Sequence, residues 1–352
     1  MSDLRTRIAE IISRDGPMPV SLYMLMCLHD PVHGYYATRA GFNRDFTTAP
    51  ETSQIFGELI GLWTAQVWQA MASPAKLHLI ELGPGRGAMM RDMLRVAAAV
   101  PGFTAALDVT LVEASPLLRQ QQKEHLAGHP IRHADNLDAA PDGPAIIVAN
   151  EFLDCLPIRQ FVRRDGRWHE RQIGLAADGR LIFGLSPPVD LPADVTPQGD
   201  EAEYAPALET LTASLADRFA KSPGFALFVD YGPRSSTPAD TLRAYRDGQQ
   251  VDPLADPGAS DLTADVDFAR LGALATKAGL AVHGPVSQGT FLTALGARAR
   301  ERALAAVNPA RTTEIAQAVD TLVSPDKMGE RFQLIAIGSP GFGAPPGFEE
   351  PT

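Results

Sequence analysis

The sequence predicts an α/β protein with a doubly wound, mostly parallel sheet. Short apolar segments, typical of strands buried on both faces, alternate with segments of helical periodicity over residues 77–149. A turn with three glycines at 83–87 follows the first of these strands and precedes a helix. Alternation of strands and helices requires right-handed crossover connections, which place successive strands parallel in one sheet.

The remaining elements follow in an order that such a sheet allows. Strands are expected at 77–82, 107–112, 131–134, 145–149, 224–229, 280–283 and 332–337. Helices are expected at 4–12, 20–28, 55–71, 88–100, 116–126, 205–220, 262–278, 291–304 and 312–322. Thr263 is a candidate N-cap for the helix at 262–278, because threonine satisfies free amides at a helix start. The polar stretch 233–260 reads as a long loop.

Two regions depart from this alternation. Three strands at 160–162, 168–173 and 181–185 are separated by Asp-Gly turns, which indicates an antiparallel insertion. Residues 30–53 have no clear period and are rich in aromatic and small polar side chains, and such long loops are often functional.

These segments suggest five parts. We expect an N-terminal helical cap on the substrate side, a cofactor-binding half, the antiparallel insertion with its helix, a C-terminal half of the fold, and a Gly- and Pro-rich flexible tail. Their expected bounds are 1–75, 76–157, 158–222, 223–338 and 339–352.

Composition limits the partners and the compartment. The chain has 352 residues and a formal net charge of -11, which disfavours nucleic acid and anionic membranes and suits a cationic protein segment, although it also serves solubility alone. Cys27 and Cys155 form no disulfide framework or metal motif, and His29 with His33 has no third ligand, so no metal is expected. No signal-peptide core or membrane-length apolar run is visible, so the expected location is cytoplasmic.

The strongest functional signal is the segment Glu81-Leu82-Gly83-Pro84-Gly85-Arg86-Gly87. Glycines allow a sharp turn and a close approach of the backbone to a ligand, and the following helix offers free amide groups. The position of the turn between a strand and a helix makes the motif far more specific than glycines alone. We therefore expect Glu81, Gly83, Gly85 and Gly87 to bind a cofactor.

Acids at the ends of the next strands extend this site. Glu113 ends the second strand and is placed to accept hydrogen bonds from both hydroxyls of a ribose. Asp135 ends the third strand and is a candidate acceptor for an adenine amine, with an ordinary loop acid as the alternative. Asn150 ends the fourth strand and joins the cofactor-binding set, because ligands bind beyond the carboxyl ends of parallel strands.

The turn favours S-adenosylmethionine over NAD. An NAD fingerprint has the spacing G-x-G-x-x-G, whereas the glycines here are spaced G-x-G-x-G, although Ala88 at the third position is tolerated. A carboxylate at Glu81 would repel a pyrophosphate but accept from the ammonium of an amino acid. An NAD-dependent oxidoreductase stays as a weaker alternative.

Motifs along nearly the whole chain resemble the MidA-type family of class I methyltransferases, which have a Rossmann-like fold. The family includes bacterial and mitochondrial members, among them an arginine methyltransferase that acts in respiratory complex I assembly. The matching segments are 33–36, 45–58, 81–87, 113–116, 150–157, 230–232, 241–245, 261–268, 288–289 and 328–333.

A few positions differ from the family pattern. Arg44 stands where the family usually has glycine, and Thr47 where it usually has isoleucine. The loop after Tyr245 usually carries a histidine, but here Gly248 and Gln249 lie in a histidine-free segment. These departures fall in loops rather than in the cofactor turn, so they bear on the substrate and not on the fold.

The resemblance implies methylation of an arginine in a protein substrate, such as a complex I subunit. Carboxylates that grip a guanidinium would orient it toward the methyl donor. Glu151 and Glu51 are the first candidates, and Asp154 and Asp230 are weaker ones. The expected substrate-binding residues are Tyr35, Tyr36, Thr48 and Tyr231, of which the first two would close over the cation or simply pack in the cap.

One further alternative is a protein that binds the cofactor but does not catalyse methyl transfer. A cofactor-binding assembly factor without turnover would carry the same glycine turn and the same acids. A homodimer through the apolar C-terminal helix pair is also open.

Overall fold

The computed structural model describes residues 3–38, 48–234 and 237–349. The chain forms two compact units, each assembled from three stretches of sequence. The antiparallel unit comprises Met1–Phe46, Leu153–Thr210 and Ser235–Arg270, and the sheet unit comprises Thr47–Phe152, Leu211–Arg234 and Leu271–Thr352. Positions 45–47 of the family motif, and with them Thr47, lie outside the described residues, as does Arg44.

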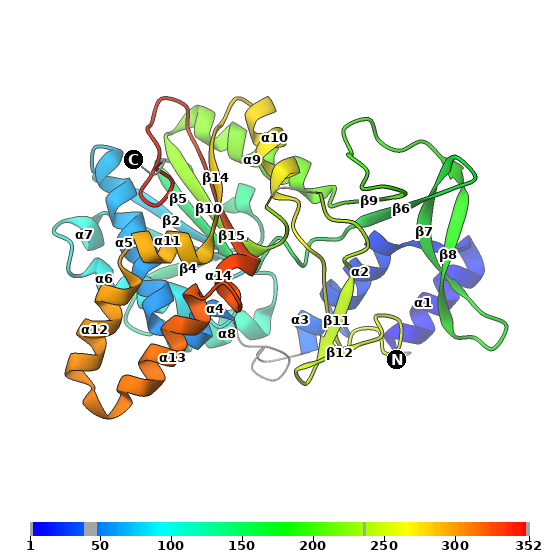
Figure 1. Ribbon diagram of the computed structural model, residues 1–352, viewed down its shortest axis with the longest axis horizontal. Coiled ribbons are helices and arrows are strands. Elements are labelled where there is room, and N and C mark those ends of the chain that lie inside the picture. The colour runs from blue at the N-terminus through cyan, green and yellow to red at the C-terminus, as the bar shows by residue number, and fades with distance from the viewer. Residues whose placement is uncertain (1–2, 39–47, 235–236, 350–352) are drawn as a thin grey trace. The chain divides into compact units, whose positions relative to one another are not determined.

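The sheet unit is built on seven strands in the order β14-β15-β10-β5-β2-β3-β4 (Figure 1). β15 runs antiparallel to β10 and β14, and the five strands from β10 to β4 are parallel, which confirms the expected mostly parallel α/β fold. The bounds are β2 (Leu77–Leu82), β3 (Leu107–Val112), β4 (Ile131–Ala134), β5 (Ala145–Asn150), β10 (Gly224–Tyr231), β14 (Ala281–Ser287) and β15 (Phe332–Gly338).

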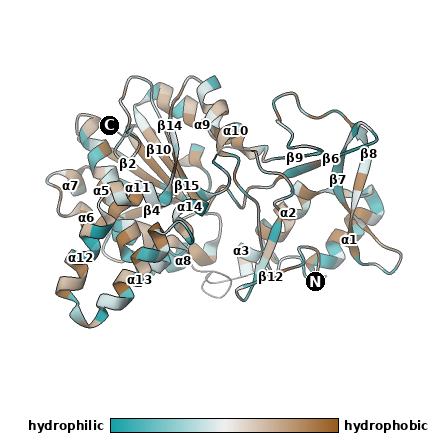
Figure 2. Cartoon of the chain, in the orientation of Figure 1, coloured by the Kyte–Doolittle hydropathy of each residue, from teal (hydrophilic) through white to brown (hydrophobic). Residues whose placement is uncertain are grey.

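The central strands are buried along almost their whole length. Every residue of β2 and β15 is buried, as are all but the last residues of β5 and β10. Figure 2 shows these strands as largely apolar, as expected for strands covered on both faces.

The strand register aligns the ends where the predicted site residues lie. Leu82 of β2 pairs with Val112 of β3 and with Ala149 of β5. Asn150 of β5 pairs in turn with Val229 of β10. The residues that follow these positions therefore emerge together at one edge of the sheet, which is where ligands bind in open parallel sheets.

Helices of the sheet unit complete its core. They are α4 (Ala49–Thr52), α5 (Gln54–Ala70), α6 (Ala88–Ala97), α7 (Phe103–Ala106), α8 (Pro116–His125), α11 (Gln288–Ala294), α12 (Ala297–Val307), α13 (Thr312–Val323) and α14 (Met328–Arg331), with 3-10 turns at Leu137–Ala139 and Pro309–Arg311. We expected α5 in an N-terminal segment ending at residue 75, but it belongs to the sheet unit. The reason is that most of α5 is buried in the core of that unit, including Phe56 and Trp63.

Glycines set the distance between α5 and α6. A Cβ atom on Gly57 would lie 2.7 Å from Cβ of Asp92, and one on Gly61 would lie 2.7 Å from Cα of Met93. Both contacts are closer than side chains tolerate, so the two helices approach each other through glycine. Because α6 starts at the glycine turn, this packing also positions the turn.

The expected flexible tail at 339–352 is packed as far as the structure describes it. Trp63 Nε1 donates a hydrogen bond to the carbonyl of Pro346 at 3.1 Å. The ring of Phe348 is buried and lies 5.3 Å from that of Phe291. The hydrogen bond from Trp63 and the packing of Phe348 therefore fix a segment that its Gly and Pro content predicts to be disordered.

The antiparallel unit contains the expected insertion. Its elements are α1 (Leu4–Asp15), β1 (Met18–Pro19), α2 (Val20–His29), α3 (Tyr35–Thr38), β6 (Arg159–Arg164), β7 (Arg167–Leu175), β8 (Leu181–Val189), β9 (Glu201–Tyr204), β11 (Arg243–Arg246), β12 (Gln249–Val251) and β13 (Asp261–Thr263). β1, β6, β8 and β9 extend the sheet around β7, and the strand order β12-β11-β13 forms a second sheet. Two helices, α9 (Ala207–Lys221) and α10 (Phe268–Lys277), span the unit boundaries.

Two expectations for residues 233–278 are wrong. Asp261–Thr263 is a strand paired with β11, and the helix begins only at Phe268, so Thr263 caps nothing. The expected loop contains a hairpin in which Asp247 and Gly248 both have positive φ, as a two-residue turn requires. Within the described residues no helix is both long and apolar enough to cross a membrane.

Candidate functional site

The glycine turn has the conformation that only glycine adopts easily. Gly83, Gly85 and Gly87 have φ values of 61°, 52° and 82°. A Cβ atom on Gly83 would lie 2.9 Å from Cδ2 of Phe152, and Gly87 is the N-cap of α6. The turn therefore exposes backbone at the end of β2, where a side chain would block a ligand.

Glu81 places a carboxylate beside this turn. It is the penultimate residue of β2 and only 2% exposed. Burial alone raises the pKa of its carboxyl group to about 8. Its Oε2 atom is buried and has no hydrogen-bond partner among the described residues. A buried acceptor of this kind suits a cationic donor group, such as the ammonium of an amino acid.

Glu113 follows β3 and is held on both carboxylate oxygens. Its Oε1 accepts from the backbone N–H of Ser115 at 2.7 Å, and its Oε2 accepts from Nε2 of Gln122 at 3.3 Å. Burial raises the pKa of Glu113, and the bond from Ser115 opposes that rise. Gln122 also donates to the carbonyl of Gly85 at 2.6 Å, so one amide joins the acid to the glycine turn.

Gln122 is a site residue that the sequence reasoning missed. It is fully buried, and it shares the buried face of α8 with Leu118. A polar residue four positions after a buried leucine, on the inward face of an otherwise polar helix, was the available signal.

Asp135 occupies a different environment from Glu113. Its side chain is 81% exposed and pairs with Arg119 at 2.6 Å. Arg119 was also missed, and it donates to the carbonyl of Glu113 at 2.6 Å and to that of Ala134 at 3.2 Å. This arginine therefore ties the ends of β3 and β4 together, with Asp135 as its exposed partner.

The short helix α4 brings Glu51 to the glycine turn. Oε1 of Glu51 lies 3.7 Å from Nη1 of Arg86, inside the turn. Its Oε2 is buried and has no partner among the residues that the structure describes. Burial raises the pKa of Glu51, while Arg86 lowers it. Thr48 precedes α4, and its carbonyl accepts from the N–H of Glu51 at 3.0 Å.

Glu151 continues the site at the end of β5. It has a positive φ of 50°, which is uncommon for a residue with a side chain. Its Oε1 accepts from Nδ2 of Asn150 at 3.0 Å and from the N–H of Ala49 at 3.3 Å. Oδ1 of Asn150 is a third buried acceptor without a partner in the described part of the chain. Helix α4 thus contacts both the glycine turn and the end of β5.

Asp230 and Tyr231 end β10 in the same unit. Asp230 is completely buried, and its two oxygens accept from the backbone N–H groups of Phe152 at 3.0 Å and Tyr231 at 2.9 Å. The ring of Tyr231 lies 5.4 Å from that of Phe332 and 5.2 Å from the guanidinium of Arg331. Asp230 therefore fixes the backbone between the ends of β5 and β10.

Three predicted site residues belong to the antiparallel unit. The hydroxyl of Tyr36 donates to Oδ1 of Asp261 at 3.3 Å, and Tyr35 is fully buried with its ring edge-on to that of Tyr36. Oδ2 of Asp154 accepts from Oγ1 of Thr263 at 2.8 Å. The other predicted site residues all lie in the sheet unit.

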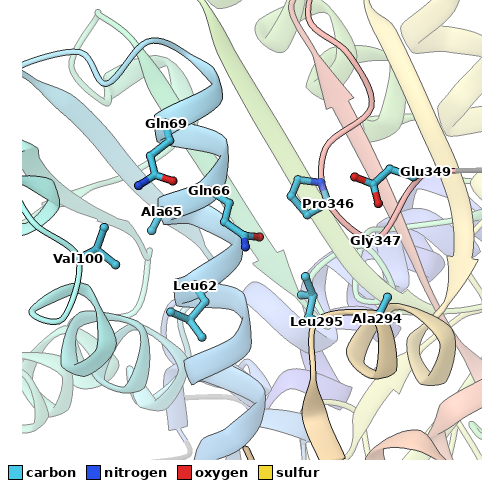
Figure 3. Close-up of a pocket in the computed structure, with 10 residues that line it drawn as sticks. All are labelled: Leu62, Ala65, Gln66, Gln69, Val100, Ala294, Leu295, Pro346, Gly347 and Glu349. Carbon is cyan, nitrogen blue, oxygen red and sulfur yellow. The ribbon is translucent and has the colours of Figure 1, made fainter. Parts of the chain in front are cut away.

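A separate cavity in the sheet unit contains none of these residues. It has a volume of about 360 Å³ and lies between α5, the end of α11 and the C-terminal segment (Figure 3). Its lining includes Leu62, Gln66, Leu295 and Pro346. Within the described residues, no group of three or more His, Cys, Asp or Glu side chains is placed to hold a metal ion.

Comparisons with known proteins agree on the family. A model of S-adenosyl-L-methionine-dependent methyltransferases matches residues 59–286. The mitochondrial protein arginine methyltransferase NDUFAF7 of Danio rerio is 36% identical and covers 94% of this chain and 85% of that protein. The NDUFAF7 of Homo sapiens is 35% identical and covers 93% and 81%, respectively.

A solved structure extends the likeness to the fold. A COG1565 superfamily member from Burkholderia thailandensis, bound to S-adenosyl-homocysteine, superposes with a TM-score of 0.83. It is 27% identical and covers 98% of this chain and 93% of that chain. S-adenosyl-homocysteine is the product that S-adenosylmethionine leaves after it gives up its methyl group.

One expectation is overturned by these relatives. We expected a cytoplasmic location, but the curated NDUFAF7 relatives are mitochondrial by name, and this finding overturns the expectation.

Three features of the site fit S-adenosylmethionine, a nucleoside with an ammonium and no phosphate. They are the buried acceptor atom of Glu81, the hydrogen bonds that hold both carboxylate oxygens of Glu113, and the glycine turn, whose backbone has no side chains in the way of a ligand. The family model covers most of the chain, and the NDUFAF7 relatives match nearly all of it. The chain belongs to the family of S-adenosylmethionine-dependent methyltransferases that includes NDUFAF7.

Proposed function

We propose that this protein methylates an arginine side chain of a protein substrate. The observation that carries the proposal is a set of buried acceptor atoms in the sheet unit without a partner among the described residues: Oε2 of Glu81, Oε2 of Glu51 and Oδ1 of Asn150. Acceptors without donors suit cationic ligands, and both the methyl donor and a guanidinium are cationic. The relatives named protein arginine methyltransferases support the same substrate class.

The cofactor-binding roles follow from the turn and the strand ends. Gly83, Gly85 and Gly87 give the ligand close access to the backbone. Glu113 accepts from the ribose hydroxyls, and Glu81 accepts from the ammonium. Asp135 is the candidate for the adenine amine. When bound, S-adenosylmethionine supplies an electrophilic methyl group on a positively charged sulfur.

Glu151 is proposed to bind the guanidinium group of the substrate arginine. A guanidinium stays protonated at working pH, so one nitrogen becomes nucleophilic only when the charge is drawn to the others. A carboxylate that binds two of its N–H groups does this and fixes its direction. Glu151 suits the task because Ala49 and Asn150 already orient its carboxylate.

Other acids and aromatic residues have supporting roles in the proposal. Glu51 is the second carboxylate for the guanidinium, with Asn150 between the cofactor and the substrate. Asp230 acts through the backbone of Phe152, because that is where its carboxylate is bound. Tyr35, Tyr36, Thr48, Tyr231 and Asp154 are proposed for the substrate side.

The finer part of the proposal concerns the partners. The family resemblance favours a subunit of respiratory complex I as substrate and a role in the assembly of that complex. The net charge of -11 suits a cationic segment of such a substrate. A homodimer through α12 and α13 is a separate expectation, and light scattering of the purified protein tests it directly.

The function is tested with labelled S-adenosylmethionine and a mitochondrial lysate. Mass spectrometry should find methylated arginine that is absent with Glu151→Gln, and no modified arginine in any protein would overturn the proposal. If Glu151→Gln instead retained partner binding and cellular function, a non-catalytic assembly factor would be the better reading. Calorimetry with NAD in parallel tests the oxidoreductase alternative.

A further inference from the structure

We propose that Gln122 is a positioning residue that holds the glycine turn and the ribose-binding acid in one fixed arrangement. The inference rests on the proposed placement of the cofactor between Gly85 and Glu113. It assigns the affinity for S-adenosylmethionine partly to a side chain that does not touch the cofactor.

Both donor positions and the oxygen of the Gln122 amide form hydrogen bonds. Nε2 donates to the carbonyl of Gly85 at 2.6 Å and to Oε2 of Glu113 at 3.3 Å. Oε1 accepts from Nε2 of His133, in β4, at 2.8 Å. The side chain of Gln122 is completely buried. One amide therefore joins the glycine turn, the end of β3 and β4.

The direction of the amide is set by its neighbours. Gly85 and Glu113 both offer acceptors, so the NH₂ group must face them, and the oxygen must face His133. Burial lowers the pKa of His133, which leaves that ring neutral, with its proton on the nitrogen that faces Gln122. Because a flipped amide would set two acceptors against its oxygen, the arrangement has a single orientation.

The consequence for Glu113 is a carboxylate held at both oxygens. Ser115 fixes Oε1 through its backbone N–H, and Gln122 fixes Oε2. Each oxygen keeps further acceptor capacity for a ribose hydroxyl. Without Gln122, one oxygen loses its support and the carbonyl of Gly85 loses its donor, so the turn and the acid lose their common anchor. Cofactor binding would then have to order both groups.

The test compares two substitutions of Gln122 with a matched control. Gln122→Met keeps the length and removes both donors, and Gln122→Glu keeps the shape but sets an acceptor against Glu113. The control is Gln120→Met, on the same helix, because Gln120 is exposed and its side chain bonds, among the described residues, only to Glu124. Calorimetry should show about tenfold or weaker binding of S-adenosylmethionine for both Gln122 variants and no change for the control.

A second readout separates positioning from a general loss of structure. For Gln122→Met, KM for S-adenosylmethionine should rise while kcat at saturation stays within about twofold, since bound cofactor restores the arrangement. Unchanged affinity, or a fall in kcat with no change in KM, would overturn the inference. Circular dichroism of both variants without cofactor verifies that they fold. If Gln122→Met does not fold, the same measurements are made on Gln122→Glu.

Glu113→Gln distinguishes this inference from the function on which it rests. If that variant binds S-adenosylmethionine as the wild type does, the proposed cofactor placement is wrong. If it binds weakly while Gln122→Met binds normally, only the role of Gln122 is wrong. The double variant should lose less affinity than the two single losses combined, because Gln122 acts partly through Glu113. Fully additive losses would contradict that coupling.

Discussion

Glu151 accepts a hydrogen bond from the backbone of Ala49, a residue 102 positions earlier in the chain. The same oxygen accepts from Asn150, so two donors orient the carboxylate before any substrate binds. Its positive φ of 50° adds a backbone conformation that costs energy for a residue with a side chain. Such strain is typical of positions where function dictates the geometry, and it supports the proposal that Glu151, rather than Asp230, contacts the substrate arginine.

Replacing the Glu151 carboxylate should reduce catalysis far more than cofactor binding. We expect Glu151→Gln to lower kcat about 10- to 100-fold, because a bond from a charged acceptor to the guanidinium is worth roughly 1.5–3 kcal/mol. Affinity for S-adenosylmethionine should stay within about twofold. Methyl transfer from labelled cofactor gives kcat, and calorimetry gives the affinity. Equal losses in both would instead place Glu151 at the cofactor.

Cofactor affinity should increase with pH through Glu81. Its pKa of about 8 leaves the carboxyl mostly protonated at pH 6 in the free protein. An ammonium binds the ionised form, so binding must expel the proton, and affinity should rise about tenfold from pH 6 to pH 7. Calorimetry at both pH values measures this. In Glu81→Gln the affinity for S-adenosylmethionine should be weaker and should hardly change between pH 6 and pH 7. If the affinity of this variant rose with pH as that of the wild type does, another group would be responsible for the pH dependence.

The same group should affect stability with the opposite sign. The folded protein holds the Glu81 proton up to about pH 8, whereas the unfolded chain releases it near 4.5. The folded state therefore binds more protons between these values, and its free energy of unfolding falls as pH rises through them. Urea unfolding at pH 5 and pH 8 should show that Glu81→Gln loses part of this decrease. Equal decreases in variant and wild type would contradict the raised pKa.

The fold was predictable where local pattern and burial coincide. β2 and β5 are short, fully or almost fully buried runs that are mainly apolar, and such runs can be identified as strands from the sequence. The strands in region 243–263 could not be predicted, because β11, β12 and β13 have only four, three and three residues. Such short strands do not show an alternation of apolar and polar residues. Asp247-Gly248 was a readable turn signal, but no strand pattern flanked it. Thr263 looked like a helix cap because its strand partner is remote in sequence.

The site was predictable as far as its residues follow strands. Glu81, Glu113 and Asn150 could be proposed from the sequence because strand ends converge at one edge of a parallel sheet. Gln122 and Arg119 were missed because their roles depend on which carbonyl groups a helix side chain reaches, and that is a matter of packing. The contact between α4 and Glu151 was beyond sequence reasoning for the same reason.

Glu113 and Asp135 should differ sharply although both follow strands. Glu113 is buried and held by Ser115, whereas the side chain of Asp135 is 81% exposed. Glu113→Gln should weaken S-adenosylmethionine binding by about tenfold or more, and Asp135→Asn by less than about threefold, since exposed charges contribute little. Titration calorimetry of both variants measures this. A larger loss for Asp135→Asn would make the adenine contact the dominant one.

The C-terminal segment should contribute to stability rather than to cofactor binding. Phe348 is buried against Phe291, and the neighbouring Pro346 accepts the indole N–H of Trp63. Phe348→Ala should lower the free energy of unfolding by about 3 kcal/mol, because it empties a buried aromatic site. Glu349→Gln is the matched control, since Glu349 is exposed next to it at the rim of the cavity between α5 and α11 (Figure 3). Urea unfolding should separate the two variants while their affinities for S-adenosylmethionine stay equal. If Phe348→Ala unfolded like the wild type, the segment would be the flexible tail that its composition suggests.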